Sequence, residues 1–349
     1  AVGTAGSTGG TWALGGALAT VAGTRPGLLQ QTNRRTVYIQ AGTGYALSST
    51  NQFLICAVTR YIGYSATRGD NGRVTFTATE ANFNMGWDSN TEVNRVAVAN
   101  LIFDGGGYSA VNGIYGQNGN TASIGFVNCK FYRIEAAISG FISSNSRPQF
   151  LNCEMIDSTA TPITAPQTCL SGCTLSGSAA YHINAANVVV INCILANSAS
   201  AGLYVSNAYV YLDRCVIYGS GGNGVSTTGD NPVVIRNSIF VDNSGYGISI
   251  SYNPDKRWGA VHNCAYYNNT SGQFSDPESI PGFSHLTDIT LTADPFIDAA
   301  NGDFRLNNTA GGGALCRAAG IGPAGQTNAI DIGAVQHADA GGVIVVEED

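Results

Sequence analysis

Charged residues are scarce in this chain. Only 11% of the 349 residues are Asp, Glu, Lys or Arg, and the lysines are limited to Lys130 and Lys256. The formal net charge is −7 at pH 7. Nucleic acids and anionic membranes are held mainly by clustered Lys and Arg. The composition therefore argues against nucleic acid and against a membrane surface as partners.

Long apolar runs are also missing. No stretch approaches the roughly 18 uninterrupted apolar residues that a membrane-spanning helix needs, so we expect no membrane insertion. The first residue is Ala1 rather than Met. This start fits the removal of a leader and equally fits a trimmed chain.

A short motif recurs through the middle of the chain. It reads as an apolar pair, Asn-Cys, one variable residue and another apolar residue, and its copies are 20 to 26 residues apart. The Cys position, called the slot below, holds Cys129, Cys153, Cys173, Cys193, Cys215, Ser238 and Cys264 in turn. A second landmark keeps the same period at Ile114, Ile138, Ile163, Ile183, Leu203, Val225 and Ile248. Two markers in phase indicate one structural unit per period.

Each period contains two or three short β-branched runs separated by Gly, Asn and Ser, and strongly helical stretches are absent. Such strands can wind as a coil, in which each turn pairs in parallel with the turns above and below it. The sequence therefore predicts an all-β solenoid of roughly ten to eleven coils with a core of stacked like residues.

The residue before the slot is usually Asn. Asn tolerates the left-handed backbone of a tight corner, and its amide can bond to the amide of the next coil. We expect a structural ladder of Asn128, Asn152, Asn192, Asn237 and Asn263, beside a column of Cys129, Cys153, Cys173, Cys193, Cys215 and Cys264, with Gly172 and Arg214 as interruptions of the Asn row.

The slot cysteines are interpreted as small buried apolar residues, because stacked side chains about 4.8 Å apart and parallel suit no relaxed disulfide. Cys169 and Cys173 form the one local pair that could bridge, and their state stays open.

Several segments resemble the right-handed parallel β-helix, or pectin-lyase-like, superfamily. GGTWALGGALATV and RTVYIQAGTGYAL resemble its capping segment and first strand, while TADPFIDAANGDFRLNNTA and AIDIGAVQ resemble the closing segment of secreted members. The resemblance implies an N-terminal segment with a cap (1–36), a β-helix (37–290), a closing segment (291–336) and a hinge with a terminal strand (337–349). It also implies an extracellular or cell-surface protein, or part of a virion.

Catalytic signatures of the superfamily are lacking. The Asn-Thr-Asp, Asp-Asp, His-Gly and Arg-Ile-Lys elements of its polygalacturonan hydrolases do not occur. The best constellation is Asp213, Arg236 and His262, each two residues before its slot and so on consecutive coils. These side chains could bind a sugar acid or supply a base. We favour the alternative, a surface ladder in which Arg236 bridges its neighbours, and we expect neither a metal site nor a cofactor.

The residue after the slot changes character along the chain. It is polar in the early coils, as at Lys130, Glu154 and Thr174, and apolar in the later ones. The later residues, called the apolar ridge below, are Ile194, Val216, Ile239 and Ala265. Monomers seldom leave such a row exposed. Either a loop such as 269–290 covers it, or another subunit does.

A second candidate for assembly follows a Gly-rich hinge. Val343, Ile344, Val345 and Val346 form a short β-branched run with no strand left to pair with in sequence order. We expect this run to add to an exposed sheet edge of its own chain or of a neighbour.

Our leading hypothesis is a non-enzymatic structural protein that packs with copies of itself into a filament, fibre or surface layer. One alternative is a polysaccharide lyase or glycoside hydrolase whose atypical site contains Asp213, Arg236 and His262. A second alternative is an adhesin that binds glycans through exposed tyrosines such as Tyr204. The Arg-Gly-Asp run at 68–70 is interpreted as an ordinary turn.

Overall fold

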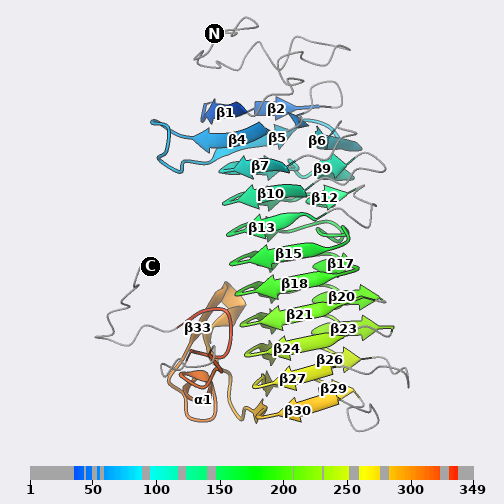
Figure 1. Cartoon of the computed structure of the whole chain (residues 1–349), viewed down its shortest axis with the longest axis vertical. Coiled ribbons are helices and arrows are strands. Elements are labelled where there is room, and N and C mark those ends of the chain that lie inside the picture. Colours follow the sequence, from blue (N-terminus) through cyan, green and yellow to red (C-terminus); the bar gives the residue numbers. More distant parts are fainter. Residues whose placement is uncertain are drawn as a thin grey trace, which may run out of the picture.

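The computed structural model describes residues 35–42, 45–48, 53–55, 59–88, 95–116, 123–139, 147–206, 208–229, 232–250, 259–275, 283–322 and 330–336. These residues form an elongated stack of coils (Figure 1). Almost all of the regular structure is parallel β-sheet, as the period of the sequence predicts. Among the described residues, no helix has the length and apolarity to cross a membrane.

The first sheet contains eleven parallel strands, one from each successive coil. In order they are β1 (Arg35–Gln40), β4 (Thr59–Tyr64), β7 (Arg95–Ala99), β10 (Ser123–Val127), β13 (Gln149–Leu151), β15 (Thr168–Ser171), β18 (Val188–Ile191), β21 (Val210–Asp213), β24 (Val233–Arg236), β27 (Gly259–His262) and β30 (Phe283–Leu286).

The second sheet also contains eleven parallel strands and follows the first around a tight corner. Its strands are β2 (Tyr45–Leu47), β5 (Val74–Ala78), β8 (Leu101–Asp104), β11 (Lys130–Tyr132), β14 (Glu154–Ile156), β16 (Thr174–Ser176), β19 (Ile194–Ala196), β22 (Val216–Tyr218), β25 (Ile239–Val241), β28 (Ala265–Tyr267) and β31 (Ile289–Thr290).

The third face is made of two sheets that isolated bridges at Ile163 join. The first holds β3 (Phe53–Ile55), β6 (Phe83–Asp88), β9 (Val111–Gly116) and β12 (Ile138–Ser139). The second holds β17 (Ile183–Ala185), β20 (Leu203–Ser206), β23 (Val225–Thr228), β26 (Tyr246–Ile250) and β29 (Gly272–Ser275). The apolar landmark seen in the sequence is therefore one continuous column, running from Ile114 to Ile248.

The slot residues form a second buried column, as predicted. Their hydrogen bonds explain why Ser238 can take the place of Cys in one coil. The Cys193 thiol donates to the carbonyl of Ile191 (3.2 Å) and accepts the backbone N–H of Cys173 (3.3 Å). Ser238 does the same with Arg236 O and Cys215 N. A small side chain that both donates and accepts satisfies a buried N–H of the preceding coil. The slot is therefore a hydrogen-bonding position as well as an apolar one.

The Asn corner separates the first and second sheets. All five predicted Asn residues have positive φ, between 50° and 57°, and Asn100 adds a member one coil earlier (φ 58°). Side-chain amide hydrogen bonds run from Asn128 to Asn100 (2.8 Å) and from Asn263 to Asn237 (3.0 Å). Gly172 and Arg214 take the same left-handed conformation without an Asn side chain, so Asn192 stands alone between an early section (Asn100, Asn128, Asn152) and a late section (Asn237, Asn263).

Cys169 and Cys173 are not bridged, because both are free. Cys173 points into the core, where its side chain is 1% exposed, whereas Cys169 lies on the outer side of β15 and is partly exposed.

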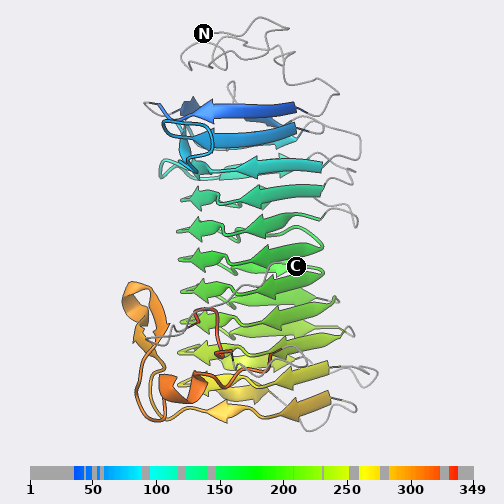
Figure 2. The same ribbon diagram turned by 60° about the vertical axis from the view of Figure 1, so that its left-hand side comes forward.

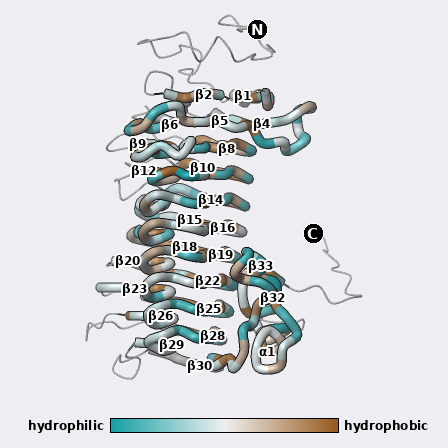
Figure 3. Tube along the Cα trace, turned by 180° about the vertical axis from the view of Figure 1, so that it is seen from behind, coloured by the Kyte–Doolittle hydropathy of each residue, from teal (hydrophilic) through white to brown (hydrophobic). Residues whose placement is uncertain are grey.

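After β31 the chain leaves the stack and folds back against the outside of the second sheet, as Figures 2 and 3 show. Residues 291–336 are called the C-terminal cover below. The cover contains β32 (Phe296–Asp298), the 3₁₀ turn η1 (Ala299–Asn301), β33 (Asp303–Leu306) and α1 (Gly313–Cys316). The two strands pair antiparallel, and the rings of Phe296 and Phe304 meet edge to face with centroids 5.3 Å apart.

The cover corrects one expectation from the sequence. The apolar ridge is not an exposed face for a second subunit, since Val216, Ile239 and Ala265 are 1%, 0% and 0% exposed beneath the chain's own cover. Ile194 at the margin is partly buried against the same cluster. Among the described residues, the cover comes from the closing segment that follows the 269–290 excursion, and of the excursion Ile289 packs against it. Val343, Ile344, Val345 and Val346 lie outside the described residues, as do residues 1–34 of the N-terminal segment (1–36) in which the cap was expected.

Candidate functional site

The three residues proposed as a possible catalytic set do stack on consecutive coils. Asp213 pairs with Arg236 across β21 and β24, and Arg236 pairs with His262 across β24 and β27. The sequence phase therefore placed the backbone of each residue correctly. Their accessibility differs from the expectation of an outward corner, because Asp213 is only 4% exposed.

Both oxygens of the Asp213 carboxylate are occupied. Oδ2 accepts from Nη2 of Arg236 (3.1 Å) and lies 3.5 Å from Nε of Arg214, while Oδ1 accepts from Nδ2 of Asn237 (3.0 Å). Burial disfavours the charged guanidinium of Arg236, but the hydrogen bond to Asp213 and the charges of Asp213 and Tyr211 together outweigh burial and raise the pKa of Arg236. The guanidinium carbon also lies 5.4 Å from the ring centroid of Tyr211. Asp213 is thus the anchor of an ion pair.

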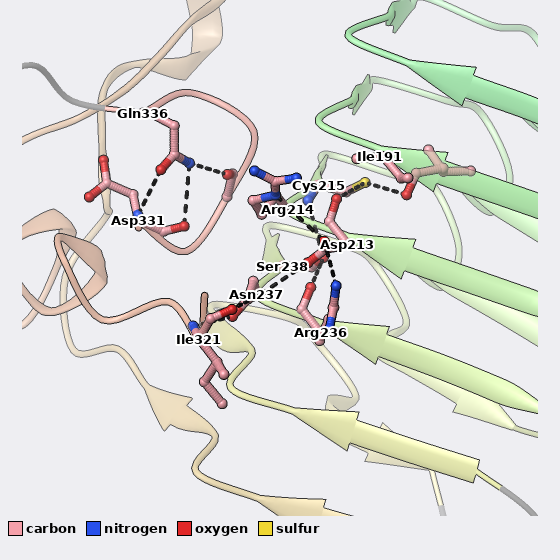
Figure 4. Close-up of polar contacts among 12 residues, drawn as sticks. Ile191, Asp213, Arg214, Cys215, Arg236, Asn237, Ser238, Ile321, Asp331 and Gln336 are labelled. Atoms are coloured by element: carbon pink, nitrogen blue, oxygen red, sulfur yellow. Dashed lines mark hydrogen bonds and ion pairs between the residues drawn. The ribbon is translucent and has the colours of Figure 1, made fainter. Parts of the chain in front are cut away.

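The cover explains why this carboxylate is buried, and Figure 4 shows the junction. The Asn237 amide donates to Ile321 O (3.1 Å) and accepts from Ile321 N (2.8 Å) and from Asn263 (3.0 Å). Gly333 N donates to the carbonyl of Asn237 (2.8 Å). The cover therefore docks onto the late section of the Asn ladder, directly beside Asp213.

Gly333 is required at this junction by geometry. Its φ is +104°, and a Cβ there would stand 2.8 Å from Cδ1 of Ile239. Any larger residue would be strained in backbone and would press on the buried ridge.

The third face carries neutral polar groups. The outward register column from β17 to β29 is Asn184, Tyr204, Ser226, Ser249 and Ser275. Ser275 Oγ donates to Ser249 Oγ (2.9 Å), and the Tyr181 and Tyr204 rings stack with centroids 5.1 Å apart. No Asp, Glu, His, Lys or Arg stands in this column, so it lacks an acid, a base and a charged anchor.

Charge gathers instead on the early coils of the second sheet. Glu154 accepts from Arg73 and lies 3.5 Å from Nζ of Lys130, while Arg133 and Asp104 form a second pair at 2.8 Å. Arg73 also binds Oδ1 of Asn128. Partial burial acts against ionisation of Glu154, but the hydrogen bonds and positive charges of Arg73 and Lys130 together lower the pKa of this carboxyl. The Lys130–Glu154 pair predicted from the phase is present, and Arg73 completes it from three coils before Glu154.

Metal ligands do not gather in the part of the chain that the structure describes, where no group of three or more His, Cys, Asp or Glu side chains converges on one point. This finding concerns the arrangement of donors in those residues.

Comparison with known proteins supports the same architecture. The family model for the right handed beta helix region matches residues 161–309. The described residues form a parallel β-helix, and residues 161–309 match the right-handed type. No curated protein sequence matches this β-helix.

Solved structures similar to this β-helix include proteins with different roles. The A-module of the Azotobacter vinelandii mannuronan C-5 epimerase AlgE4 is 13% identical, with a TM-score of 0.37, over 72% of this chain and 90% of that one. The pectate lyase Pel9A is 11% identical, with a TM-score of 0.47, over 87% and 88%. ORF18 of Geobacillus virus E2 is 12% identical, with a TM-score of 0.45, over 73% and 52%. Similarity of this order describes a fold and transfers no activity.

The Arg-Gly-Asp run is a turn of the β-helix, as interpreted from the sequence. The Asp70 carboxylate accepts backbone N–H bonds from Ser65, Ala66, Thr67 and Gly72 at 2.7–3.0 Å. These bonds lower the pKa of Asp70 and leave the side chain engaged within its own turn.

His182 is a residue that the sequence reasoning missed. It is 0% exposed in the β-helix core, and its Nε2 donates to the carbonyl of Ala196 (2.8 Å). Its Nδ1 has no hydrogen-bond partner in the described protein. Burial lowers the pKa of His182 to about 4, so the ring is neutral at pH 7. No motif marks it; its position one residue before Ile183 of the apolar landmark was the available signal.

Proposed function

We propose that this protein is a non-enzymatic structural subunit, secreted or virion-borne, that self-associates into a filament, fibre or surface layer. The observation that carries the proposal is the state of Asp213, because the strongest catalytic candidate has both carboxylate oxygens engaged beneath the C-terminal cover. A general base must reach the proton that it removes, and a nucleophile must reach the reacting atom.

The third face supports the same proposal. Hydrolysis of a glycosidic bond ordinarily uses two carboxyl groups about 5 to 10 Å apart. The described outward column of this face consists of Asn, Tyr and Ser residues. Such side chains can form hydrogen bonds with a neutral partner, but they supply neither of the two acids.

An assay combined with a mass measurement tests the proposal. Purified protein is incubated with neutral and uronic-acid polysaccharides, with and without calcium, and reducing and unsaturated ends are quantified. We expect no release, together with a mass above that of one chain in concentrated solution by sedimentation. Release of such ends that His262→Ala and Asp213→Asn both abolish, while each variant stays folded by circular dichroism, would establish the enzyme alternative.

A second candidate, an adhesin that binds neutral glycans, is favoured by the stacked rings of Tyr181 and Tyr204. Asn184 and Ser226 flank Tyr204 in the register of the third face. Aromatic rings of this kind present an apolar plane and a polar hydroxyl to a ligand. Retention on immobilised neutral polysaccharide that Tyr204→Ala removes, with unchanged thermal stability, would support this function.

A further inference from the structure

The first sheet presents an outward face that is largely apolar. The name apolar strip is used for Ala99, Val127, Leu151, Cys169, Val189 and Ile191, which lie on the outer side of β7 to β18 in two adjacent register columns. The same columns hold two polar residues, Gln149 and Ser171. Val127 and Leu151, directly paired on neighbouring coils, are 38% and 45% exposed. Large apolar side chains in adjacent register positions are the feature that distinguishes a contact surface from scattered exposed residues.

The strip is free of charge along its length. The register column through Ala97 continues as Gly125, Gln149, Cys169, Val189, Tyr211, Val234 and Ala260, without a charged residue. The neighbouring column through Ala99 stays uncharged as far as Ile191. Arg60 precedes the first column and Asp213 follows the second. Two such faces brought together would therefore oppose no like charges.

The other faces of the coil stack are covered, charged or polar in the described residues, and the exposed apolar side chains of the cover, Ile297, Leu315 and Ile321, lie off the stack. The late coils of the second sheet lie under the C-terminal cover, and the early coils carry the paired charges around Glu154. The third face is polar. The slot column ends in Asp288, whose carboxylate accepts from Cys264 N (2.8 Å) and from the Tyr266 hydroxyl (3.3 Å). A polar residue at that position does not continue the buried column into a second molecule.

We infer that the apolar strip is the surface through which a second copy of this chain packs, first sheet against first sheet. This inference rests on the proposed self-association and names the face that performs it. Two sheets pack about 10 Å apart when their outer side chains interdigitate. A flat and rigid face without charge suits another face of the same shape, whereas nucleic acids and anionic membranes require clustered cations.

The area of the strip sets the strength of the contact. The strip from β7 to β18 spans four strand spacings, about 19 Å at 4.8 Å each. With a width of about 10 Å for two outward side chains, the strip covers roughly 190 Å², about a quarter of the 800 Å² per partner in a standard interface. The copies therefore associate weakly in pairs and more firmly where an assembly repeats the contact.

Sedimentation of the full chain over a range of concentrations tests this inference. Leu151→Arg places a charge in the middle of the strip, and Leu315→Arg makes the same change at a residue of the cover with a similar exposure of 44%. We expect Leu151→Arg to raise the dissociation constant at least about tenfold, because a buried unpaired charge costs several kcal/mol. Leu315→Arg should leave it within about twofold, as should raising the salt to about 0.5 M, because apolar contacts are not screened.

The contrary outcomes separate this inference from the proposed function. If the wild-type chain associates and the Leu151→Arg variant associates equally well, the strip is not the interface. The proposed self-association would still hold. If the wild-type chain stays monomeric at every concentration, a variant ending at residue 336 decides between the two remaining explanations. Association of that variant, abolished by Leu151→Arg, would mean that residues 337–349 occupy the strip in place of a second copy. A monomeric truncated variant would overturn both the strip and the proposed function.

Discussion

The first and second sheets each present a row of apolar residues to the outside of the stack, the strip on the earlier coils and the ridge on the later ones, yet only the ridge is covered. The ridge of Val216, Ile239 and Ala265 is sealed by the C-terminal cover. The strip around Val127 and Leu151 remains open in the described structure. Burial of apolar area stabilises a protein by about 25 cal/mol per Å², so both rows gain from a partner.

The difference lies in what the end of the chain supplies. Phe296, Phe304 and Ile332 provide apolar surface against the ridge, and the backbone around Ile321 bonds to Asn237. A solenoid face is therefore completed by a segment that does not belong to the repeat. The first sheet receives no such segment from the described residues, which is the reason for assigning it to contact between copies.

We expect the largest difference between the two rows in the free energy of unfolding when the same charge is placed in each row. Ile239→Glu buries an unpaired carboxylate under the cover and should lower the free energy of unfolding by about 3–5 kcal/mol. Leu151→Glu stands on the open strip and should change it by less than about 0.5 kcal/mol in dilute solution. Urea denaturation followed by circular dichroism measures both. Equal losses would mean that the two rows do not differ in burial.

Acid should destabilise the interior beneath both faces through His182. The ring has a pKa of about 4 in the folded chain and its ordinary value of 6.5 in the unfolded chain, so the unfolded chain binds the proton first as the pH falls. The stability that neutral His182 contributes is complete above pH 6.5 and is lost as the pH falls towards 4, by about 3 kcal/mol at 1.36 kcal/mol per pKa unit.

Denaturation midpoints between pH 7.5 and 4 check this expectation. His182→Gln retains a donor for Ala196 O and should show a flatter profile than the wild-type chain over that range. An unchanged slope in the variant would assign the acid sensitivity to other groups, and a direct titration of the ring by NMR would then give its pKa independently.

Substituting one Asn of the early section and one of the late section should give smaller differences in the free energy of unfolding. Asn128→Ala removes the hydrogen bond to Asn100, the partly exposed hydrogen bonds from Arg73 and the left-handed preference of the residue, at a cost of about 1–2 kcal/mol. Asn237→Ala has the same backbone cost and also strips partners from Asp213 and from the Ile321 backbone of the cover. Its cost should be about 2–4 kcal/mol. Limited proteolysis within the cover should accelerate in Asn237→Ala and not in Asn128→Ala.

The repeat allowed much of the fold to be predicted. The slot column, the apolar landmark and the left-handed Asn corner depend on residues at a fixed period, and each coil repeats the same local physics. The register of Asp213, Arg236 and His262 followed from that period as well. The period of the sequence predicts the position of a residue along its coil. In the structure, each of these residues lies at the predicted position.

Exposure was harder to predict because it depends on a segment outside the repeat. Ile239 was placed in an outward row that either a loop or another subunit would cover, and Asp213 at an outward corner, whereas Ile239 is buried beneath the cover and Asp213 is 4% exposed beside it. The signal for this cover was the pattern of Phe296, Phe304 and Leu306, apolar residues too many for a surface turn. Leu151 is exposed, as its outward position in the period predicts. The sequence analysis named the ridge, and not the row of Leu151, as a candidate for assembly.

Hydroxyl-radical footprinting at increasing protein concentration tests the central claim most directly, because it measures the access of solvent to Ile239 and Leu151 in one sample. The account predicts that Ile239 is protected at every concentration, while Leu151 is labelled in dilute solution and becomes protected as copies associate. Labelling of Ile239 in dilute solution, or labelling of Leu151 that stays constant while the mass rises, would contradict it.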